Sequence, residues 1–130
     1  MTVAIDTNVL VRLLTADDAA QFKASQKLFA RELIFIPDSV ILETEWVLRG
    51  AFELSREDVC AALRMVCGLP NVTVENPALV AQCLDWHEAG LDFADAFHIS
   101  RSVQQDVFKT FDAALIKRAK KVTTLRVEKP

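Results

Sequence analysis

The sequence has little of what marks disordered, fibrous or disulfide-bonded proteins. Its 130 residues include only three glycines and four prolines, and it has no tyrosine. Apolar residues make up 52% and charged residues 25% of the chain, which excludes a low-complexity or disordered protein. A chain of this length can bury a sizeable core, so we expect one domain over residues 1–130.

Long apolar segments are also missing. No run approaches the roughly 18 residues that a membrane-spanning helix requires. The N-terminus lacks the basic and then apolar pattern of a signal peptide. We therefore expect a cytoplasmic protein with no membrane partner.

The three cysteines do not form a recognisable framework. Cys60, Cys67 and Cys83 contain no CxxC pair, and neither His87 nor His98 completes a zinc-type spacing. They are interpreted as small buried side chains in a reducing compartment. Cys83 lies one helical turn before His87, which leaves a thiol nucleophile as a weaker alternative, because no partner that would orient this histidine is evident.

Excess positive charge is absent as well. The net charge is −3, which argues against a surface that binds nucleic acid throughout. Basic residues do crowd the last fourteen positions, where a solvated helix face followed by a tail is the simpler interpretation. They are Lys117, Arg118, Lys120, Lys121, Arg126 and Lys129.

What the sequence does contain is a regular alternation of strand-like and helix-like segments. The strand-like segments are residues 3–5, 33–36, 72–74 and 107–111, with a possible last edge strand over 122–127. The helix-like segments are about residues 9–14, 18–32, 38–49, 55–67, 77–89, 92–99 and 112–121, with Asp38 or Ser39 predicted to cap the third. This alternation predicts a three-layer α/β/α domain with a mostly parallel central sheet.

The apolar segment at the N-terminus stops abruptly at Asp6, Thr7 and Asn8. Asp6 fits a carboxylate that a buried parallel strand delivers to its C-terminal end, where ligands bind in such folds. It also fits the N-cap of the following helix. Because other acids occupy comparable positions, we favour the ligand role for Asp6 and assign the cap to Thr7 and Asn8.

Three further acids stand at such positions. Asp112 directly follows a strand-like segment, and Asp95 lies in the first turn of a helix that Asp92 is predicted to cap. Glu43 is predicted to lie on the packed side of its helix, where an unpaired charge is costly. Glu45 is predicted to point elsewhere and to have no special role.

Four converging carboxylates without matching lysines or arginines would repel one another. A divalent cation offsets this repulsion, and oxygen ligands favour Mg²⁺ or Mn²⁺. Such a site is typical of phosphodiester or phosphoryl chemistry. The alternative is that each acid is a separate helix cap or surface residue.

Four motifs resemble those of PIN-domain ribonucleases, and most closely the VapC toxins of bacterial toxin–antitoxin pairs. They are Ile5–Leu10, Glu43 in its Val-Ile-Leu-Glu context, Asp92–His98 and Thr110–Asp112, and the resemblance covers essentially the whole chain. It implies a metal-dependent endoribonuclease that uses an activated water. The acids that match the family's Mg²⁺- or Mn²⁺-binding quartet are Asp6, Glu43, Asp95 and Asp112.

The resemblance also implies supporting residues near this quartet. Thr7 and Asn8 would hydrogen-bond the carboxylates, Asp92 would act as a helix cap and an outer ligand, and Thr110 occupies a position that is often small and polar. Arg12 fits either a contact with substrate phosphate or a surface salt bridge. His98 fits either a packed histidine or a catalytic one.

The partners that the resemblance implies are an RNA substrate, such as tRNA, and a small antitoxin protein. It further implies a homodimer or an antitoxin-bound hetero-oligomer. Trp46, Phe52 and Leu54 could supply an apolar association surface, or could pack in the core.

Two other functions remain open from the sequence. An Asp-dependent phosphatase or phosphotransferase would use Asp6 as a nucleophile, but it would need a second acid where Asn8 stands. A non-catalytic RNA- or protein-binding module with the same fold is the other, although the four intact acids argue against it.

Overall fold

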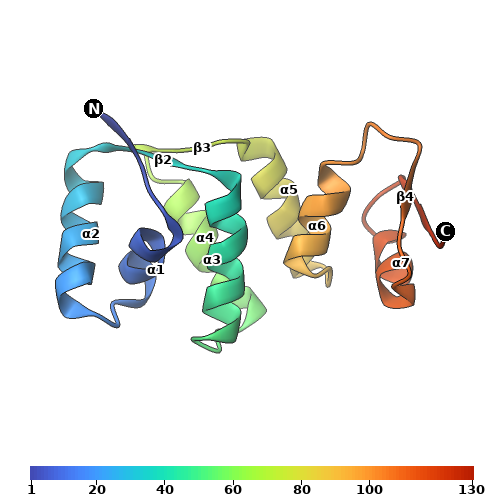
Figure 1. Ribbon diagram of the computed structural model, residues 1–130, viewed down its shortest axis with the longest axis horizontal. Helices are drawn as coiled ribbons and strands as arrows, with labels where there is room; N and C mark the ends of the chain where they lie inside the picture. The colour runs from blue at the N-terminus through green and yellow to red at the C-terminus, as the bar shows by residue number, and fades with distance from the viewer. The chain divides into compact units, whose positions relative to one another are not determined.

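The computed structural model describes residues 1–130, which form two compact units, residues 1–77 and 78–130. Figure 1 shows the order of the elements along the chain. The two units are described one after the other. The prediction that residues 1–130 form one domain stays a prediction.

The first unit contains a three-stranded sheet. Its strands are β1 (Thr2–Ala4), β2 (Leu33–Ile36) and β3 (Val72–Val74), in the spatial order β1-β2-β3. Both pairings are parallel, with Val3 opposite Ile34 and Phe35 opposite Thr73. Parallel strands need long crossover connections, and helices provide them here. The predicted α/β class with parallel strands is confirmed in this unit.

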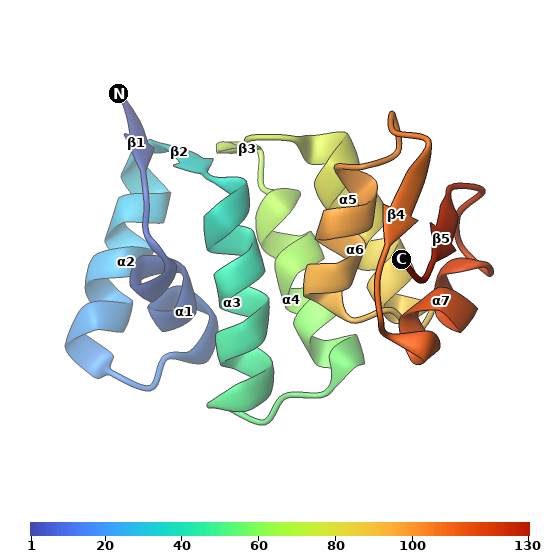
Figure 2. The ribbon, with the colours of Figure 1, turned by 45° about the vertical axis from the view of Figure 1, so that its right-hand side comes forward.

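Four helices accompany this sheet. They are α1 (Thr7–Thr15), α2 (Ala19–Arg31), α3 (Asp38–Gly50) and α4 (Arg56–Cys67). Helix α1 packs between α2 and α3, as Figure 2 shows, and α3 also packs against α4. Leu10, Ile41, Leu48 and Leu63 are fully buried in these helices.

The first strand differs from its prediction. The sequence predicted a buried strand, but β1 is an edge strand in which only Val3 is even half-buried. The first buried residue is Ile5, directly after β1. It donates its backbone N–H to Phe35 O and is only 6% exposed. An edge strand lacks a neighbour on one side, so its apolar residues need not be covered.

The beginning of α3 also differs from its prediction. Neither Asp38 nor Ser39 is its N-cap, because the cap residue is Pro37, whose side chain cannot accept a hydrogen bond. Instead, a carboxylate oxygen of Glu75 accepts the backbone N–H of Asp38 at 3.0 Å. The end of β3 therefore supplies the anion that a helix N-terminus favours. In contrast, Asp18 and Ser55 cap α2 and α4 with their own side chains.

The second unit is built from α5 (Pro77–Glu88), α6 (Phe93–Ser100), β4 (Val107–Lys109), α7 (Ala113–Ala119) and β5 (Arg126–Glu128). Strands β4 and β5 are parallel, with Phe108 opposite Val127. The predicted last edge strand is thus present, although it is confined to three residues. Strand β4 likewise ends at Lys109, before the predicted Phe111.

Aromatic packing joins α5 to α6 within this unit. The rings of His87 and Phe93 meet edge to face with centroids 5.3 Å apart, and Phe93 meets Phe97 in the same way at 5.2 Å. Such edge-to-face pairs add stability beyond the area that they bury. None of the seven helices combines the length and apolar character that crossing a bilayer demands.

Candidate active site

Asp6 lies at the point where the chain leaves β1 and enters α1. It is the N-cap of α1, because its Oδ1 accepts the backbone N–H of Val9 at 3.1 Å. The assignment of this cap to Thr7 and Asn8 is therefore wrong, since both residues are already helical. Asp6 Oδ2 receives no hydrogen bond, and the side chain is exposed. Capping therefore fixes the orientation of the carboxylate and leaves one oxygen available to a ligand.

Glu43 on α3 faces the same surface hollow as Asp6. This hollow, which we call the acidic hollow, has a volume of about 480 Å³. Its lining residues are Asp6, Thr7, Asn8, Ser39, Val40, Glu43 and Val47. The structure thus brings four of the predicted site residues together within the first unit.

The burial of the two glutamates on α3 is the reverse of the prediction. Glu43 is exposed, whereas Glu45 is only 2% exposed and forms an ion pair with Arg49, with 2.8 Å between Glu45 Oε2 and Arg49 Nε. The prediction that Glu45 has no special role is therefore wrong. The signal was present in the sequence, because Arg49 stands four residues after Glu45, the spacing at which helical side chains meet.

The second unit holds the other predicted acids. Asp92 caps α6 by accepting the backbone N–H of Asp95 at 3.2 Å, as predicted. Asp112 caps α7 by accepting the N–H of Leu115 at 3.0 Å. Thr110 Oγ1 accepts the N–H of Asp112 at 3.1 Å, so the predicted supporting threonine holds the backbone of an acid.

The electrostatic field at Asp95 reflects this grouping. Burial raises the pKa of the Asp95 carboxyl, and the negative charges of Asp92 and Asp112 raise it further. His98, one helical turn along α6, acts in the opposite direction. A carboxylate whose charge is disfavoured by its neighbours gains from a bound cation, which relieves the repulsion.

The fit to a divalent cation rests on the chemistry of these donors. Hard carboxylate oxygens are the ligands that Mg²⁺ and Mn²⁺ prefer. After burial, the negative charges of Asp92 and Asp112 contribute to the raised pKa of Asp95. No group of three or more histidine, cysteine, aspartate or glutamate side chains is drawn together at ligand distance. The match to the cation is thus one of donor type and charge, and not of an assembled set of ligands.

Arg12 does not extend into solvent. Its Nη1 lies 2.8 Å from both carboxylate oxygens of Asp17, and its Nε donates to Gln21 Oε1 at 2.7 Å. Of the two roles left open by the sequence, the structure shows the ion pair. The Thr15 hydroxyl and Arg12 lower the pKa of Asp17, and the contacts of Arg12 join α1 to the first turn of α2.

The cysteines show no sign of an activated thiol. The thiol alternative pairs Cys83 with His87. In the structure Cys83 Sγ lies 3.5 Å from Ser100 Oγ, and His87 Nδ1 lies 2.7 Å from Leu91 O. Burial raises the pKa of the Cys67 thiol to about 11. A thiol with such a pKa is protonated near neutral pH and is a poor nucleophile.

Two exposed apolar side chains accompany the acids. Trp46 on α3, one turn after Glu43, is 67% exposed, while Phe111, next to Asp112, is 82% exposed. The other tryptophan, Trp86 on α5, is only 7% exposed. Of the two roles considered for Trp46, core packing is thus excluded within this chain. Phe52 and Leu54 are half-buried.

The chain was compared with curated proteins and with solved structures. No curated protein matches the chain. Among solved structures, the chain is similar to VapC20 of Mycobacterium tuberculosis, described as a toxin that cleaves the sarcin–ricin loop, with 20% sequence identity and a TM-score of 0.45. The alignment covers 97% of this chain and 99% of VapC20.

The family is established by the sequence as a whole. Residues 3–121 match the family model described as PIN domain. The matched range extends from β1 to the end of α7, and it includes all four acids of the predicted quartet. As the motifs around these acids predict, the chain belongs to the PIN-domain family.

Proposed function

We propose that this chain is a divalent-metal-dependent endoribonuclease that hydrolyses RNA phosphodiester bonds. The observation that carries the proposal is the family match, because the matched range includes Asp6, Glu43, Asp95 and Asp112. Nuclease chemistry suits these residues better than covalent catalysis, since no activated nucleophile stands beside them. The raised pKa of Cys67 also argues against that residue as a nucleophile.

In this mechanism Asp6, Glu43, Asp95 and Asp112 would hold Mg²⁺ or Mn²⁺. The cation would supply a water of lowered pKa and would offset the charge that develops on the phosphate. Asp6 and Asp112 each use one oxygen as a helix cap, which orients the other oxygen. A ligand that is oriented before binding loses less side-chain entropy when it binds.

The surrounding residues would act by positioning. Thr7 and Asn8 line the acidic hollow beside Asp6, where their polar groups would hydrogen-bond carboxylate or substrate oxygens. The Thr110 side chain accepts a hydrogen bond from the backbone N–H of Asp112, and the Asp92 side chain accepts one from the backbone N–H of Asp95. Asp92 adds negative charge next to Asp95, which strengthens the attraction for a cation.

The proposal includes a biological role. The motifs resemble those of VapC toxins, so we infer that the chain is the toxin of a toxin–antitoxin pair and acts on a structured RNA such as tRNA. A cognate antitoxin protein and a homodimer or hetero-oligomer belong to the same proposal. The exposed Trp46 is available to such an interface.

The test is RNA cleavage by the purified protein. We expect cleavage with Mg²⁺ or Mn²⁺, none with EDTA, and a loss of at least about 100-fold in Asp6→Asn and in Asp95→Asn, because each removes a charged metal ligand. Asp85→Asn serves as the control, because it removes an acid of α5 outside the proposed quartet. Isothermal titration with Mn²⁺ should show the same order of losses without RNA.

Three outcomes would contradict this function. Equal cleavage in EDTA would reject metal dependence, and full activity in Asp6→Asn and Asp95→Asn would reject the site. A phosphorylated Asp6, detected by mass spectrometry after incubation with a phosphate-monoester substrate, would instead support the phosphotransferase alternative.

A further inference from the structure

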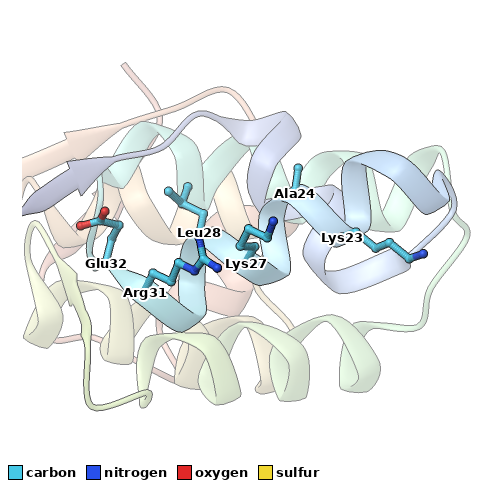
Figure 3. A pocket seen from close by; sticks show the side chains of 6 residues that line it. All are labelled: Lys23, Ala24, Lys27, Leu28, Arg31 and Glu32. Atoms are coloured by element: carbon cyan, nitrogen blue, oxygen red, sulfur yellow. The ribbon is translucent and has the colours of Figure 1, made fainter.

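Helix α2 carries its positive charges on one side. Lys23, Lys27 and Arg31 follow one another at intervals of four residues, and all three are exposed. Residues four apart in a helix lie on the same face, about 6 Å apart along the axis. We call these three residues the basic stripe, and Figure 3 shows them along α2.

The opposite side of α2 faces the core. Ser25 is 5% and Phe29 is 8% exposed, and Phe22 is half-buried. This packing against α1 fixes the orientation of the helix, so the basic stripe is held outward. Asp6 is the N-cap of α1, and α1 packs against α2, so the acidic hollow and the basic stripe belong to one compact unit.

The charges of the basic stripe are not neutralised. No hydrogen bond or ion pair involves Lys23, Lys27 or Arg31, and α2 contains no acidic residue between Ala19 and Arg31. The carboxylate of Glu32, the residue that follows Arg31, lies 3.7 Å from the N-terminal amino group.

Other basic residues of the same unit behave differently. Arg12 is paired with Asp17, and Arg49 is paired with Glu45. In a protein of net charge −3, acids are available to pair with exposed cations. What distinguishes Lys23, Lys27 and Arg31 is that three cations without partners lie on one exposed face of a helix, where an anionic ligand would pair with them.

The basic stripe borders a hollow of the surface. The hollow has a volume of about 490 Å³, close to that of the acidic hollow, and is lined by Lys23, Ala24, Lys27, Leu28, Arg31 and Glu32. Ala24 and Leu28 lie beside the basic side chains on the same helix (Figure 3).

We propose that the basic stripe binds consecutive phosphates of an RNA strand and so holds the substrate on the first unit. The inference rests on the proposed nuclease function and names a binding surface outside the acidic site. The interval of about 6 Å between its charges is close to the spacing of neighbouring phosphates along a strand. Contacts of this kind position a nucleic acid without reading its sequence.

RNA fits this surface better than an acidic protein does. A protein interface draws its stability mainly from apolar and aromatic residues at its centre. Here Leu28 is the largest apolar side chain among the lining residues, and it is half-buried by its own unit. A ligand that binds through charge alone, as nucleic acids largely do, matches what α2 presents.

The test compares two variants that carry the same change in net charge. The stripe variant is Lys23→Gln/Lys27→Gln/Arg31→Gln, and the control is Lys117→Gln/Arg118→Gln/Lys120→Gln in the basic C-terminal segment. Each variant shifts the net charge from −3 to −6, because three cations are neutralised. Glutamine retains helix propensity, and all six residues are exposed, so both variants should fold.

Binding is measured by fluorescence anisotropy with a labelled single-stranded RNA in EDTA over a series of salt concentrations. We expect the Kd of the stripe variant to rise about tenfold or more at low salt. The slope of log Kd against log salt should fall by about 2, because each phosphate contact on a single strand contributes about 0.7. With Mg²⁺, KM should rise while kcat stays unchanged, since the chemistry occurs elsewhere.

Each result decides the proposal. A stripe variant with the Kd and salt slope of the wild type, or with a loss no larger than that of the control, overturns it. A second test uses poly-glutamate as a competitor at equal charge concentration. If it displaces the RNA from the wild type and binds the stripe variant less tightly, the surface accepts an acidic protein, and the proposal is overturned. Failure of the nuclease function is distinguished by cleavage itself: RNA binding in EDTA that depends on the basic stripe would stand even if no RNA were cut.

Discussion

Among single residues, Asp6 connects folding with chemistry most directly. One of its oxygens caps α1, and the other has no hydrogen-bond donor. The sequence presented the cap and the ligand as alternatives, yet a carboxylate has two oxygens and can serve in both roles. Asp112 repeats this arrangement at α7. The motifs therefore place acids at helix N-termini, where the backbone holds them in position.

This double role predicts different results for two substitutions of Asp6. Asn is as good an N-cap as Asp, so Asp6→Asn should change the free energy of unfolding by less than about 0.5 kcal/mol. Asp6→Ala loses the cap and should cost about 1 kcal/mol. Both should abolish cleavage, because both remove the charge. Urea unfolding followed by circular dichroism measures the stabilities, and equal stabilities for the two variants would contradict the capping role.

Glu43 and Glu45 show what could not be predicted at the level of residues. The position of Glu43 in the motif was sufficient to name it, but the assumption that it faces the packed side was wrong. The apolar neighbours Val40 and Val47 border the same open hollow as Glu43, so their presence does not imply that Glu43 is buried. Burial depends on which elements pack against α3, and a single sequence does not reveal them.

At the level of elements, local signals predicted the helices well. Asp18, Ser55, Asp92 and Asp112 cap the helices that follow them, since an N-cap acts within three residues of its own position. The exception is α3, whose N-terminus is served by Glu75 from 37 residues away. Such distant contacts exist only after folding, so no local pattern announces them.

Asn71 is a second distant contact, and it leads to a prediction for α2. Its Nδ2 donates to Phe29 O at 2.7 Å and to Glu32 O at 2.9 Å, which satisfies carbonyl groups at the C-terminal end of the helix. Asn71→Ala should lower the free energy of unfolding by about 1–2 kcal/mol through the loss of these bonds. Thermal or urea unfolding measures the change.

The control for this prediction is the isosteric Asn71→Asp. A carboxylate cannot donate, and it would be repelled by the same carbonyl oxygens, so this variant should be at least as unstable as Asn71→Ala. If Asn71→Asp proved as stable as the wild type, the two hydrogen bonds would not hold the end of α2.

For the whole molecule, the α/β class and the PIN family were predictable. Alternating segments predicted the class, and the family match bears out the three-layer α/β/α fold that it implies. All three strand pairings are parallel, as expected. The length of each strand was harder to predict, because strand ends depend on a partner strand. Strand β5, confined to Arg126–Glu128, illustrates this dependence.

The distribution of charge was also only partly predictable. The sequence directed attention to the basic C-terminal segment, in which the structure shows Arg126 paired with Glu128. The unpaired basic stripe on α2 was overlooked, because its three residues are four positions apart and do not form a run. Helical spacing would have revealed it once residues 19–31 were accepted as a helix.

The contrast between the two tryptophans gives the molecule a separate optical signal in each compact unit. The chain has no tyrosine, so its fluorescence comes from the exposed Trp46 in the first unit and the buried Trp86 in the second. Trp46→Phe and Trp86→Phe thus each leave one unit visible. If residues 1–130 fold as one domain, the emission of either variant should change at the same urea concentration as its own circular dichroism. Separate midpoints within one variant would instead mean that the units unfold independently.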